Sequence, residues 1–589
     1  MVLRKLIISA IFLFIIISGF PLSAQQCPIV VNGEPRAVIL FKGEAQAGLA
    51  EAISDLKNYI YLISGAEIKI KQEPDSELNS LTLALEPDFG DTPDTRKLRE
   101  LNIEGFVIRV RNGQAWLVGR SELALQHGIY WLLGKWGCRW LFPGEAGEVI
   151  PKKPTLTVIK AMETDQQPRF LMRNLWYNYG GWLPEEVQED FRLWNRHNRM
   201  EYSLTGYIGH AYNSIVSKGD EKLFEEHPEY FRLKNGKRVR GGQICTSNPD
   251  VRERAVAYAF RFFEKNPDAT LVSFSPNDGG GTCQCSECRA IGNFSTQALA
   301  LANHVAVALK KNPQTRDKMV GMYAYFISSL PPSIAAEDNV MAFVATKFNF
   351  LPWRFLVNQW EKKTEILGIR GYASILPWHW TKPVWRLKSL RKKVQFWNDK
   401  NIIAINIESG NDWGGWGLYH YVLARLLWNP DENVDSIVDD YLQKGFGNSA
   451  GDMRNYFSRW KWCYSQRKLA LATRDIAKAL EKAQTENLRN RIGQYALYLH
   501  HLYLYNDYKR SGPNTKRLEA MKKLIGFGWR LVNTNMAHTL PLVENYLKKA
   551  AKNRFNIAAE EFNNWKRSEP FTYTEMLILL DEDLKRSPD

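Results

Sequence analysis

The sequence predicts an α/β protein: a (β/α)8 TIM barrel between a small N-terminal α+β domain and a C-terminal helical domain. Short apolar runs alternate with helical patterns over residues 161–430, as a parallel barrel requires. A strand, helix and hairpin pattern precedes this region, and an almost continuous helical pattern follows it. The 589 residues are enough for three domains of these sizes.

Residues 1–24 have the pattern of a signal peptide. A basic start at Arg4 and Lys5 is followed by an apolar stretch over 6–20 and by small residues at Ser23 and Ala24. The apolar stretch is shorter than the roughly 20 residues that span a bilayer. We therefore expect an exported protein, periplasmic or extracellular, without stable membrane insertion after cleavage. A retained N-terminal anchor is the alternative.

The predicted N-terminal α+β domain covers residues 25–160. Its first strand is expected at 37–41, and a helix over 45–64 is indicated by apolar residues at spacings of three and four. Two further strands, at 106–110 and 115–118, are joined by Asn112-Gly113, a strong hairpin signal.

The predicted catalytic barrel covers residues 161–430. Eight short apolar runs in this region are interpreted as its strands, and several of them end in polar or aromatic clusters, as an active face at the strand ends requires. These runs are 170–176, 202–207, 243–246, 270–275, 319–325, 340–345, 371–376 and 402–407.

The predicted C-terminal domain covers residues 431–589 and is helical. Ile492, Tyr495, Leu499 and Leu502 recur at helical spacing, and no alternating strand pattern competes with them. A helical domain packed on the barrel is the simplest interpretation.

Composition narrows the class of partner. The 78 basic and 63 acidic residues leave a net charge of +15, but the excess is spread along the chain and its basic runs are not interleaved with aromatic residues. Nucleic acid is therefore not an expected partner, and solvated surfaces explain most of the charge. The 73 Phe, Trp and Tyr residues are more suggestive, because rings stack on the flat apolar faces of sugars. A glycan or glycoprotein is the expected substrate.

Seven cysteines are too few for a disulfide scaffold. Three of them form a Cys-x-Cys-x-x-Cys motif at Cys283, Cys285 and Cys288, and Cys245 is a candidate fourth member. Export favours a structural disulfide, the spacing also suits a structural zinc, and free thiols are a third reading. All three stay open from the sequence.

Two carboxyl groups stand where barrel strands are predicted to end. Asp278 follows a β-rich run as part of Asn277-Asp278, just before three glycines, and Glu408 ends another such run with Asp412 close behind it. Catalytic acids lie at this end of the strands in barrel enzymes. The alternatives are that Asp278 caps a turn and that Glu408 forms a structural salt bridge.

Aromatic and polar residues gather near the other predicted strand ends. Together they would wall one mouth with rings and hydrogen-bond donors, which is how a pocket holds a sugar, although core packing is the simpler reading for any one of them. The candidate substrate-binding residues are Tyr177, His210, Tyr323, Tyr325, Trp378, Trp380, Asp412, Trp413 and Trp416. No spacing of His, Asp and Glu suggests a catalytic metal, and no phosphate loop or serine elbow is present, so no cofactor is expected.

Three segments carry a family resemblance: 227–236, 243–249 and 275–288, the last reading Ser-Pro-Asn-Asp-Gly-Gly-Gly-Thr-Cys-Gln-Cys-Ser-Glu-Cys. They resemble glycoside hydrolase family 163, whose known activity is endo-β-N-acetylglucosaminidase on complex N-glycans, and residues 418–430 look like that family's helix after the last strand. Residues 104–140 are similar to the small domain that precedes the barrel in α-glucuronidases and β-hexosaminidases.

The resemblance implies a retaining glycosidase in which the 2-acetamido group of the substrate attacks. Asn277 would then orient that amide and Asp278 would be the general acid/base, or Glu408 would be the acid and Asp278 the orienting group. A second reading is a glycosidase of different specificity, such as an α-glucuronidase, with Asp278 and Glu408 as an acid/base pair. A third is a glycan-binding barrel without catalysis.

Overall fold

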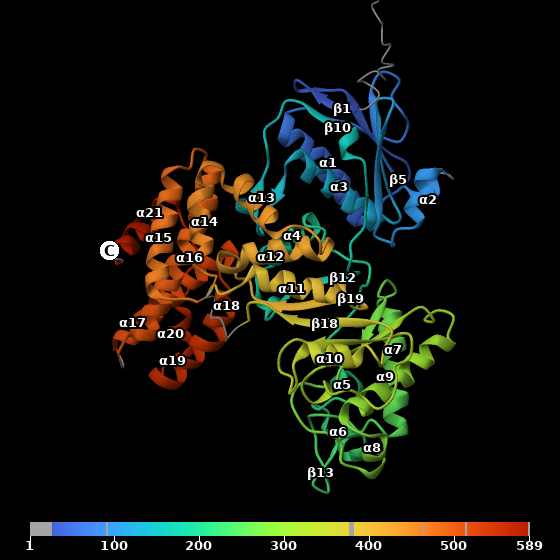
Figure 1. Cartoon of the computed structure of the whole chain (residues 1–589). Helices are drawn as coiled ribbons and strands as arrows, with labels where there is room; N and C mark the ends of the chain where they lie inside the picture. The colour runs from blue at the N-terminus through green and yellow to red at the C-terminus, as the bar shows by residue number, and fades with distance from the viewer. Residues whose placement is uncertain (1–25, 90–91, 376–381, 462, 513–514, 587–589) are drawn as a thin grey trace, which may run out of the picture. The chain divides into compact units, whose positions relative to one another are not determined.

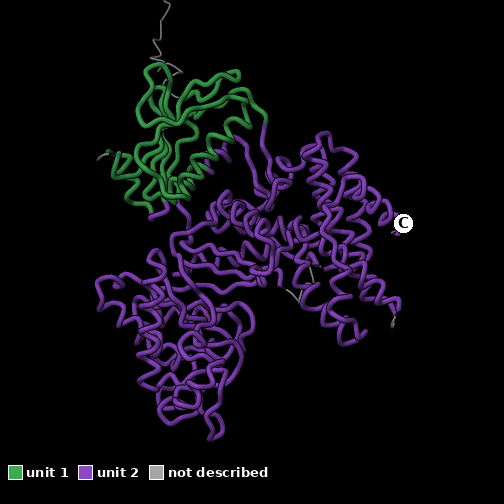
Figure 2. Tube along the Cα trace, turned by 180° about the vertical axis from the view of Figure 1, so that it is seen from behind, with its two compact units in different colours: residues 1–101, 105–129, 152–166 green, residues 102–104, 130–151, 167–589 purple. Residues whose placement is uncertain are grey.

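The computed structural model describes residues 26–89, 92–375, 382–461, 463–512 and 515–586. The predicted signal peptide lies outside these residues. The chain divides into two compact units (Figure 2). Unit 1 comprises Met1–Leu101, Gly105–Ile129 and Lys152–Gln166, and unit 2 comprises Asn102–Glu104, Tyr130–Pro151 and Gln167–Asp589. Of the helices in the described part of the chain, none is long and apolar enough to cross a membrane.

Unit 1 is an α+β unit with two sheets. One sheet has the strand order β11-β6-β7-β5-β3-β4, and the other has the order β10-β1-β2. The expected hairpin is confirmed: β6 and β7 pair antiparallel, and Asn112 and Gly113 have φ of 51° and 78°, the positive values that a tight turn of this kind needs. The strands are β1 (Gln26–Val31), β2 (Glu34–Pro35), β3 (Ala37–Phe41), β4 (Ile70–Lys71), β5 (Asn79–Leu85), β6 (Phe106–Arg111), β7 (Gln114–Gly119), β10 (Leu156–Ile159) and β11 (Thr164–Gln166).

Three helices accompany these sheets. The first, α1 (Ala47–Ser64), buries Leu49, Ile53, Leu56 and Ile60, which confirms the periodicity that predicted it. The other two are α2 (Pro93–Arg99) and α3 (Glu122–Trp136). The last turns of α3 belong to unit 2, which also contains the short antiparallel pair β8 (Arg139–Trp140) and β9 (Glu148–Val149).

Unit 2 is built on a six-stranded parallel sheet with the order β12-β19-β18-β17-β16-β15. Its hairpin β13 (Leu233–Lys234) and β14 (Lys237–Arg238) lies apart from that sheet. The expected barrel-type α/β fold is confirmed, with the sheet as a half-barrel in which every paired strand runs in the same direction. The sheet strands are β12 (Met172–Tyr177), β15 (Leu271–Ser273), β16 (Met319–Ala324), β17 (Val340–Ala345), β18 (Leu367–Tyr372) and β19 (Ile402–Ser409).

The predicted strands at 202–207 and 243–246 do not form, and the strand predicted at 371–376 lies earlier, at 367–372. These are corrections to the eight-strand expectation. The segment at 204–211 runs beside β15 through isolated bridges only, at Gly206 and His210. At Gly206 the neighbouring strand comes so close that a Cβ would lie 1.9 Å from Leu271 O, so only glycine fits there. Ile244 pairs instead with Phe231, outside the sheet.

The segment at 204–211 nevertheless helps to close the sheet. Leu204 N donates to Leu171 O beside β12, and Leu271 N donates to Thr205 O on the β15 side. The segment therefore bridges the two edge strands, and Leu204 joins the core of the sheet. That core is formed by Met172, Leu204, Leu271, Tyr323, Met341, Phe343 and Ala404.

Helices pack on the outer side of the sheet, with α7 beside β15, α9 beside β16 and β17, and α10 beside β17 (Figure 1). The helices between the sheet strands are α4 (Glu185–His197), α5 (Tyr212–Ile215), α6 (Glu221–Glu226), α7 (Pro249–Lys265), α8 (Ser286–Ile291), α9 (Phe294–Lys311), α10 (Trp353–Trp360) and α11 (Leu387–Asn398), and α12 (Trp413–Trp428) follows the last strand.

The C-terminal region is helical, as expected, and belongs to unit 2 together with the sheet (Figure 1). Every residue of α12 except Arg425 is buried, because this helix contacts α11, α13 and α16. The C-terminal helices are α13 (Val434–Phe446), α14 (Ala450–Ser458), α15 (Gln466–Glu481), α16 (Glu486–Arg510), α17 (Thr515–Leu531), α18 (Thr539–Pro541), α19 (Lys548–Phe555), α20 (Ala559–Asn563) and α21 (Tyr573–Lys585).

Candidate active site

The carboxyl ends of β15, β16, β18 and β19 form one mouth on the sheet. Parallel register brings these ends together: Ser273 on β15 pairs with Gly321 on β16, and Tyr372 on β18 pairs with Glu408 on β19. This is the edge at which barrel enzymes place their functional groups.

Asp278 lies in the loop after β15 with an exposed side chain. His210 Nε2 lies 3.9 Å from Asp278 Oδ1, and the Tyr325 phenol also interacts with this carboxyl group. Burial, and next the charge of Asp278, raise the pKa of Tyr325 to about 12. Its phenol is therefore protonated at neutral pH. His210 Nδ1 contacts Pro276 O at 2.5 Å, so Nδ1 carries a hydrogen and Nε2 is the atom that faces the carboxyl group.

Asn277 is held firmly by its neighbours. Its Oδ1 accepts from Asn213 N at 3.0 Å, and its Nδ2 donates to Gly242 O at 2.6 Å. Gln243 brackets its backbone, with Oε1 accepting from Asn277 N at 3.1 Å and Nε2 donating to Asn277 O at 2.7 Å. These bonds fix the loop that presents Asp278 and leave one amide hydrogen of Asn277 for a ligand.

Glu408 lies at the end of β19 in an ion pair with Arg370 of β18. The Arg370 side chain is 8% exposed and that of Glu408 is 17% exposed. Burial acts to lower the pKa of Arg370, but Tyr323, Tyr372 and Glu408 outweigh it and raise that pKa. The guanidinium carbon lies 4.8 Å from the Trp176 ring centroid and 4.6 Å from that of Tyr372. Arg370 Nη1 is buried and has no hydrogen-bond partner among the described residues.

A continuous series of rings connects the surroundings of the two carboxyl groups. The His210 and Tyr325 rings are 5.9 Å apart, Tyr325 and Phe348 are 5.9 Å apart, and Phe348 and Tyr372 are 5.3 Å apart. Tyr372 in turn covers Arg370. Asp278 and Glu408 therefore share one aromatic-walled mouth.

Below this mouth a buried polar network spans the sheet. Asn174 Nδ2 donates to Asn406 Oδ1 at 3.1 Å, Asn406 Nδ2 donates to Tyr323 OH at 3.2 Å, and Tyr323 OH donates to Ile208 O at 2.9 Å. The network ties β12, β19 and β16 to the segment at 204–211. Burial raises the pKa of Tyr323 to about 12, so this phenol also stays protonated.

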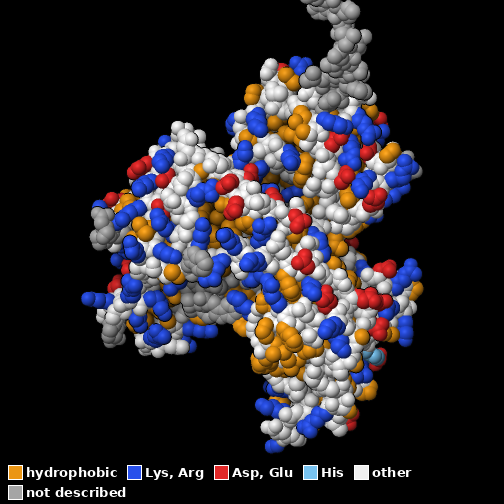
Figure 3. Space-filling model, in the orientation of Figure 1, with side chains coloured by type: hydrophobic (Ala, Val, Ile, Leu, Met, Phe, Trp, Pro, Cys, Tyr) orange, Lys and Arg blue, Asp and Glu red, His pale blue; other side chains and the backbone are white. Residues whose placement is uncertain are grey.

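The rim of the mouth is an exposed apolar surface. Figure 3 shows hydrophobic side chains gathered over the region of α10, where Phe348, Phe350, Leu351 and Phe355 are all exposed. Phe326 stacks near Phe350 at 5.2 Å. Phe326 and Phe348 both adopt positive φ, 50° and 63°, a conformation that costs a bulky residue about 1–3 kcal/mol and is concentrated at functional sites.

A small hollow lies beside the loop that carries Asp278, and its lining includes His210, Asn277, Tyr323 and Tyr325. The structure thus brings together six of the predicted site residues. These are Asn277, Asp278, Glu408, His210, Tyr323 and Tyr325.

Four other predicted residues are buried instead of lining the mouth. Trp413 Nε1 donates to Tyr177 OH at 2.6 Å, and Trp416 Nε1 donates to Lys382 O at 3.1 Å. Asp412 is fully buried, where it accepts hydrogen bonds from the Ser374 hydroxyl and from His538 N. The segment around His538 and the start of α12 cover these side chains. Trp378 and Trp380 lie outside the described residues.

Sequence reasoning did not single out Arg370, Tyr372, Phe348 or Phe350. The arginine is the one that a signal could have revealed, because it interrupts an otherwise apolar and glycine-containing strand. The exposed phenylalanines lie in a loop without periodicity. Their role emerges only once the strand ends are assembled.

One group of residues could hold a metal ion. Cys245, Cys283, Cys285 and Cys288 are all buried, and their sulfur atoms lie within 4.8 Å of one another. Among the described residues none of the seven cysteines is joined in a disulfide.

Comparison with known protein families identifies the family of this chain. It belongs to the family described as a domain of unknown function (DUF4838), whose family model matches residues 142–459. No curated protein matches the chain.

Several solved structures align with most of the chain. The structure titled "A novel family GH115 4-O-Methyl-alpha-glucuronidase, BtGH115A, with specificity for decorated arabinogalactans" aligns with a TM-score of 0.56 at 12% identity, over 93% of this chain and 81% of that chain. A GH138 enzyme targeting pectin rhamnogalacturonan II aligns at TM-score 0.45 and 14% identity over 94% and 99%. CpGH84D aligns at 0.48 and 10% over 95% and 96%. The chain therefore shares the fold of the GH115 structure, and the comparisons do not point to family 163 in particular.

Proposed function

We propose that this protein is an exported glycoside hydrolase whose active site is the mouth between Asp278 and Glu408. The observation that carries the proposal is the placement of these two carboxyl groups at the ends of β15 and β19 around one aromatic-walled opening. Glycoside hydrolysis commonly uses two such groups. The N-terminal basic and apolar segment supports export to the periplasm or the exterior.

The surroundings of the two groups suggest different roles. Asp278 is exposed and has a phenol donor and an imidazole beside it, which suits a group that exchanges a proton with the leaving oxygen and then with water. Glu408 lies in an ion pair with Arg370. It suits stabilisation of the positive charge that develops on the sugar ring, or attack on that ring.

For the substrate we propose β-N-acetylglucosaminide linkages in complex glycans, on the strength of the family 163 resemblance. The 2-acetamido group would attack in a retaining reaction, and the remaining amide hydrogen of Asn277 would meet its oxygen. The exposed phenylalanines at the rim would stack on further sugars of an extended glycan.

One observation favours a second substrate class, the uronic acids. Arg370 Nη1 is buried beside Glu408 without a hydrogen-bond partner among the described residues, and a guanidinium binds carboxylates well. The GH115 structure that shares the fold is, by its title, a 4-O-methyl-α-glucuronidase. An acidic sugar would satisfy the free guanidinium nitrogen.

The decisive experiment exposes the mature protein to a complex N-glycoprotein and, separately, to a glucuronic-acid-bearing polysaccharide, with products identified by mass spectrometry. A released glycan with a single N-acetylglucosamine at its reducing end supports the first substrate, and free uronic acid supports the second. Saturable binding without product from either would support a non-catalytic glycan-binding barrel.

The variants Asp278→Asn and Glu408→Gln test the site itself. Each should lower kcat by about 10²–10⁴. Asp278→Asn should leave the unfolding midpoint close to that of the wild type because the Asp278 side chain is 71% exposed, whereas Glu408→Gln also removes the counter-ion of the buried Arg370 and should lower that midpoint. Asp317→Asn is the matched control, because Asp317 is an exposed carboxylate in a loop, 91% accessible. Near-normal activity of both site variants would place the active site elsewhere.

A further inference from the structure

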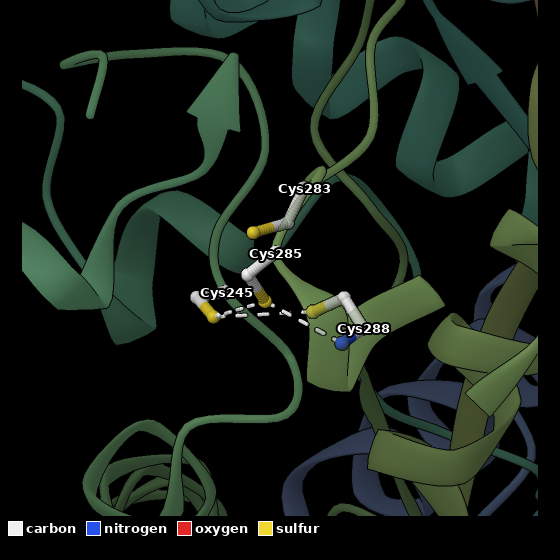
Figure 4. A group of neighbouring side chains, drawn as sticks. All are labelled: Cys245, Cys283, Cys285 and Cys288. Carbon is white, nitrogen blue, oxygen red and sulfur yellow. Dashed lines mark hydrogen bonds between the residues drawn. The ribbon is translucent and has the colours of Figure 1, made fainter. Parts of the chain in front are cut away.

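Four cysteine side chains from two stretches of the chain lie close together beside the loop that carries Asp278 (Figure 4). Cys283 and Cys285 come from that loop, Cys288 from α8, and Cys245 from a segment about 40 residues earlier in the chain. All four are buried, and they form a hydrophobic cluster of their own with Leu233 at its edge.

The distances between the sulfur atoms argue against a disulfide and match a metal site. Cys245 Sγ lies 3.7 Å from Cys285 Sγ and 3.9 Å from Cys288 Sγ. A disulfide would bring two sulfurs to about 2.05 Å. Four thiolates on a tetrahedral zinc, with Zn–S bonds of about 2.3 Å, stand about 3.8 Å apart. The observed spacing is that of the metal site.

Hydrogen-bond donors face two of the four sulfur atoms. Backbone N–H groups point at sulfur, with Leu233 N 3.2 Å from Cys283 Sγ and Cys288 N 3.4 Å from Cys285 Sγ. The Arg238 guanidinium lies 3.8 Å from Cys283 Sγ. Such donors stabilise negative charge on metal-bound sulfur and hold the ligands in place.

We propose that Cys245, Cys283, Cys285 and Cys288 bind one zinc ion as a closed, structural centre with four thiolate ligands. Four sulfur ligands leave no open coordination position, so the ion has no direct part in catalysis. On binding, each thiol releases its proton to solvent and donates a sulfur lone pair to the ion, with no change of oxidation state. The resulting charge of −2 is partly balanced by Arg238.

The proposed centre positions the catalytic loop. Gln243, two residues before Cys245, brackets the backbone of Asn277 with two hydrogen bonds, and Arg232 Nη1, next to Leu233, donates to Gly280 O at 3.0 Å. A zinc ion shared by Cys245 and the Cys283–Cys288 stretch would join two segments that flank Asp278. The segment of Cys245 holds Asn277, just before Asp278, and the Cys283–Cys288 stretch follows Asp278. Loss of the ion should therefore loosen the placement of Asp278, a consequence that rests on the proposed function.

The first test measures the ion itself. Protein purified by an affinity tag that needs no metal column should contain about one zinc per chain by elemental mass spectrometry. Exchange for Co²⁺ should give the intense visible bands of a tetrahedral site and sulfur-to-cobalt charge-transfer bands in the near ultraviolet. Neither reading depends on enzyme activity.

Single variants then assign the ligands. Cys245→Ser and Cys288→Ser should lose most of the zinc and the charge-transfer bands, whereas Cys463→Ser, which removes an exposed cysteine outside the cluster, should keep both. If the cluster variants fail to fold, the zinc content and cobalt spectrum of the wild type still decide the question.

Two results would overturn the proposal. One is metal-free protein whose intact mass shows the loss of about two hydrogens for each disulfide among these cysteines. The other is metal-free protein in which all four thiols react with a thiol reagent after unfolding. A protein that contains one zinc per chain but hydrolyses no glycan would support the metal centre. That result would count against the proposed function alone.

Discussion

Replacing Glu104 by alanine should lower the free energy of unfolding of unit 2 by about 3–5 kcal/mol. Glu104 and Arg173 form an ion pair in which both side chains are 0% exposed, with Arg173 Nη2 2.7 Å from Glu104 Oε2. The other carboxylate oxygen accepts from Ser203 N at 2.8 Å and from Ser203 Oγ at 2.7 Å. Glu104 thus links β12 to the chain that enters the segment at 204–211.

The size of the effect follows from what the alanine leaves behind. Arg173 also donates to the carbonyl oxygens of Phe170 and Arg199, but these neutral acceptors do not replace a counter-ion for a buried charge. Glu104→Gln keeps an acceptor for Ser203 and removes only the charge, so it should fall between alanine and the wild type.

Urea unfolding followed by tryptophan fluorescence measures this loss. Trp116 lies in unit 1 and the other 19 of the 20 tryptophans lie in unit 2, so the signal reports mainly on unit 2. The control is Glu189→Ala, which removes an exposed ion pair with Arg192 and should cost less than about 1 kcal/mol. A Glu104→Ala loss as small as that of the control would refute the reasoning.

Three further predictions follow from the packing, the buried charge and the rim. Gly206→Ala should prevent the accumulation of folded protein, because the added Cβ would lie 1.9 Å from Leu271 O. The control Gly451→Ala should be tolerated, because a Cβ there would have nothing within 4 Å. Soluble yield and circular dichroism compare the two variants. Burial raises the pKa of Asp412 to about 6 in the folded state, above the value of about 3.9 in the unfolded chain. Between these two pH values the folded state binds more protons than the unfolded state. The free energy of unfolding should therefore fall as pH rises from about 4 to about 6. Asp412→Asn should remove that decline from urea midpoints, and an unchanged pH profile would contradict the assignment. Phe350→Ala should leave the unfolding midpoint unchanged, because the side chain is 61% exposed. It should raise KM several-fold for a long glycan but not for a short one. Equal changes in KM for both glycans would argue against a stacking role.

The candidate site was partly predictable because strand ends have a local signature. Asp278 and Glu408 each follow an apolar run directly, so the end of the strand and the edge it reaches can be inferred from neighbours in sequence. Asp412 and Trp413 follow the same run as Glu408 and have a similar local pattern, yet they are buried. His538, more than 120 residues away, donates to Asp412 and covers that position.

Local periodicity in the sequence by itself determined the class of fold, the N-terminal hairpin and the helical C-terminal region, since these depend on contacts between residues close in the chain. Tertiary structure alone decided that 202–207 lies beside β15 without becoming a full strand, because the approach of Leu271 to Gly206 sets that geometry. It also decided that Arg370 faces Glu408 across two strands and that Cys245 meets a motif some 40 residues further along. These contacts join segments that are far apart in the sequence. No local sequence pattern indicates which distant segments will meet in the folded chain.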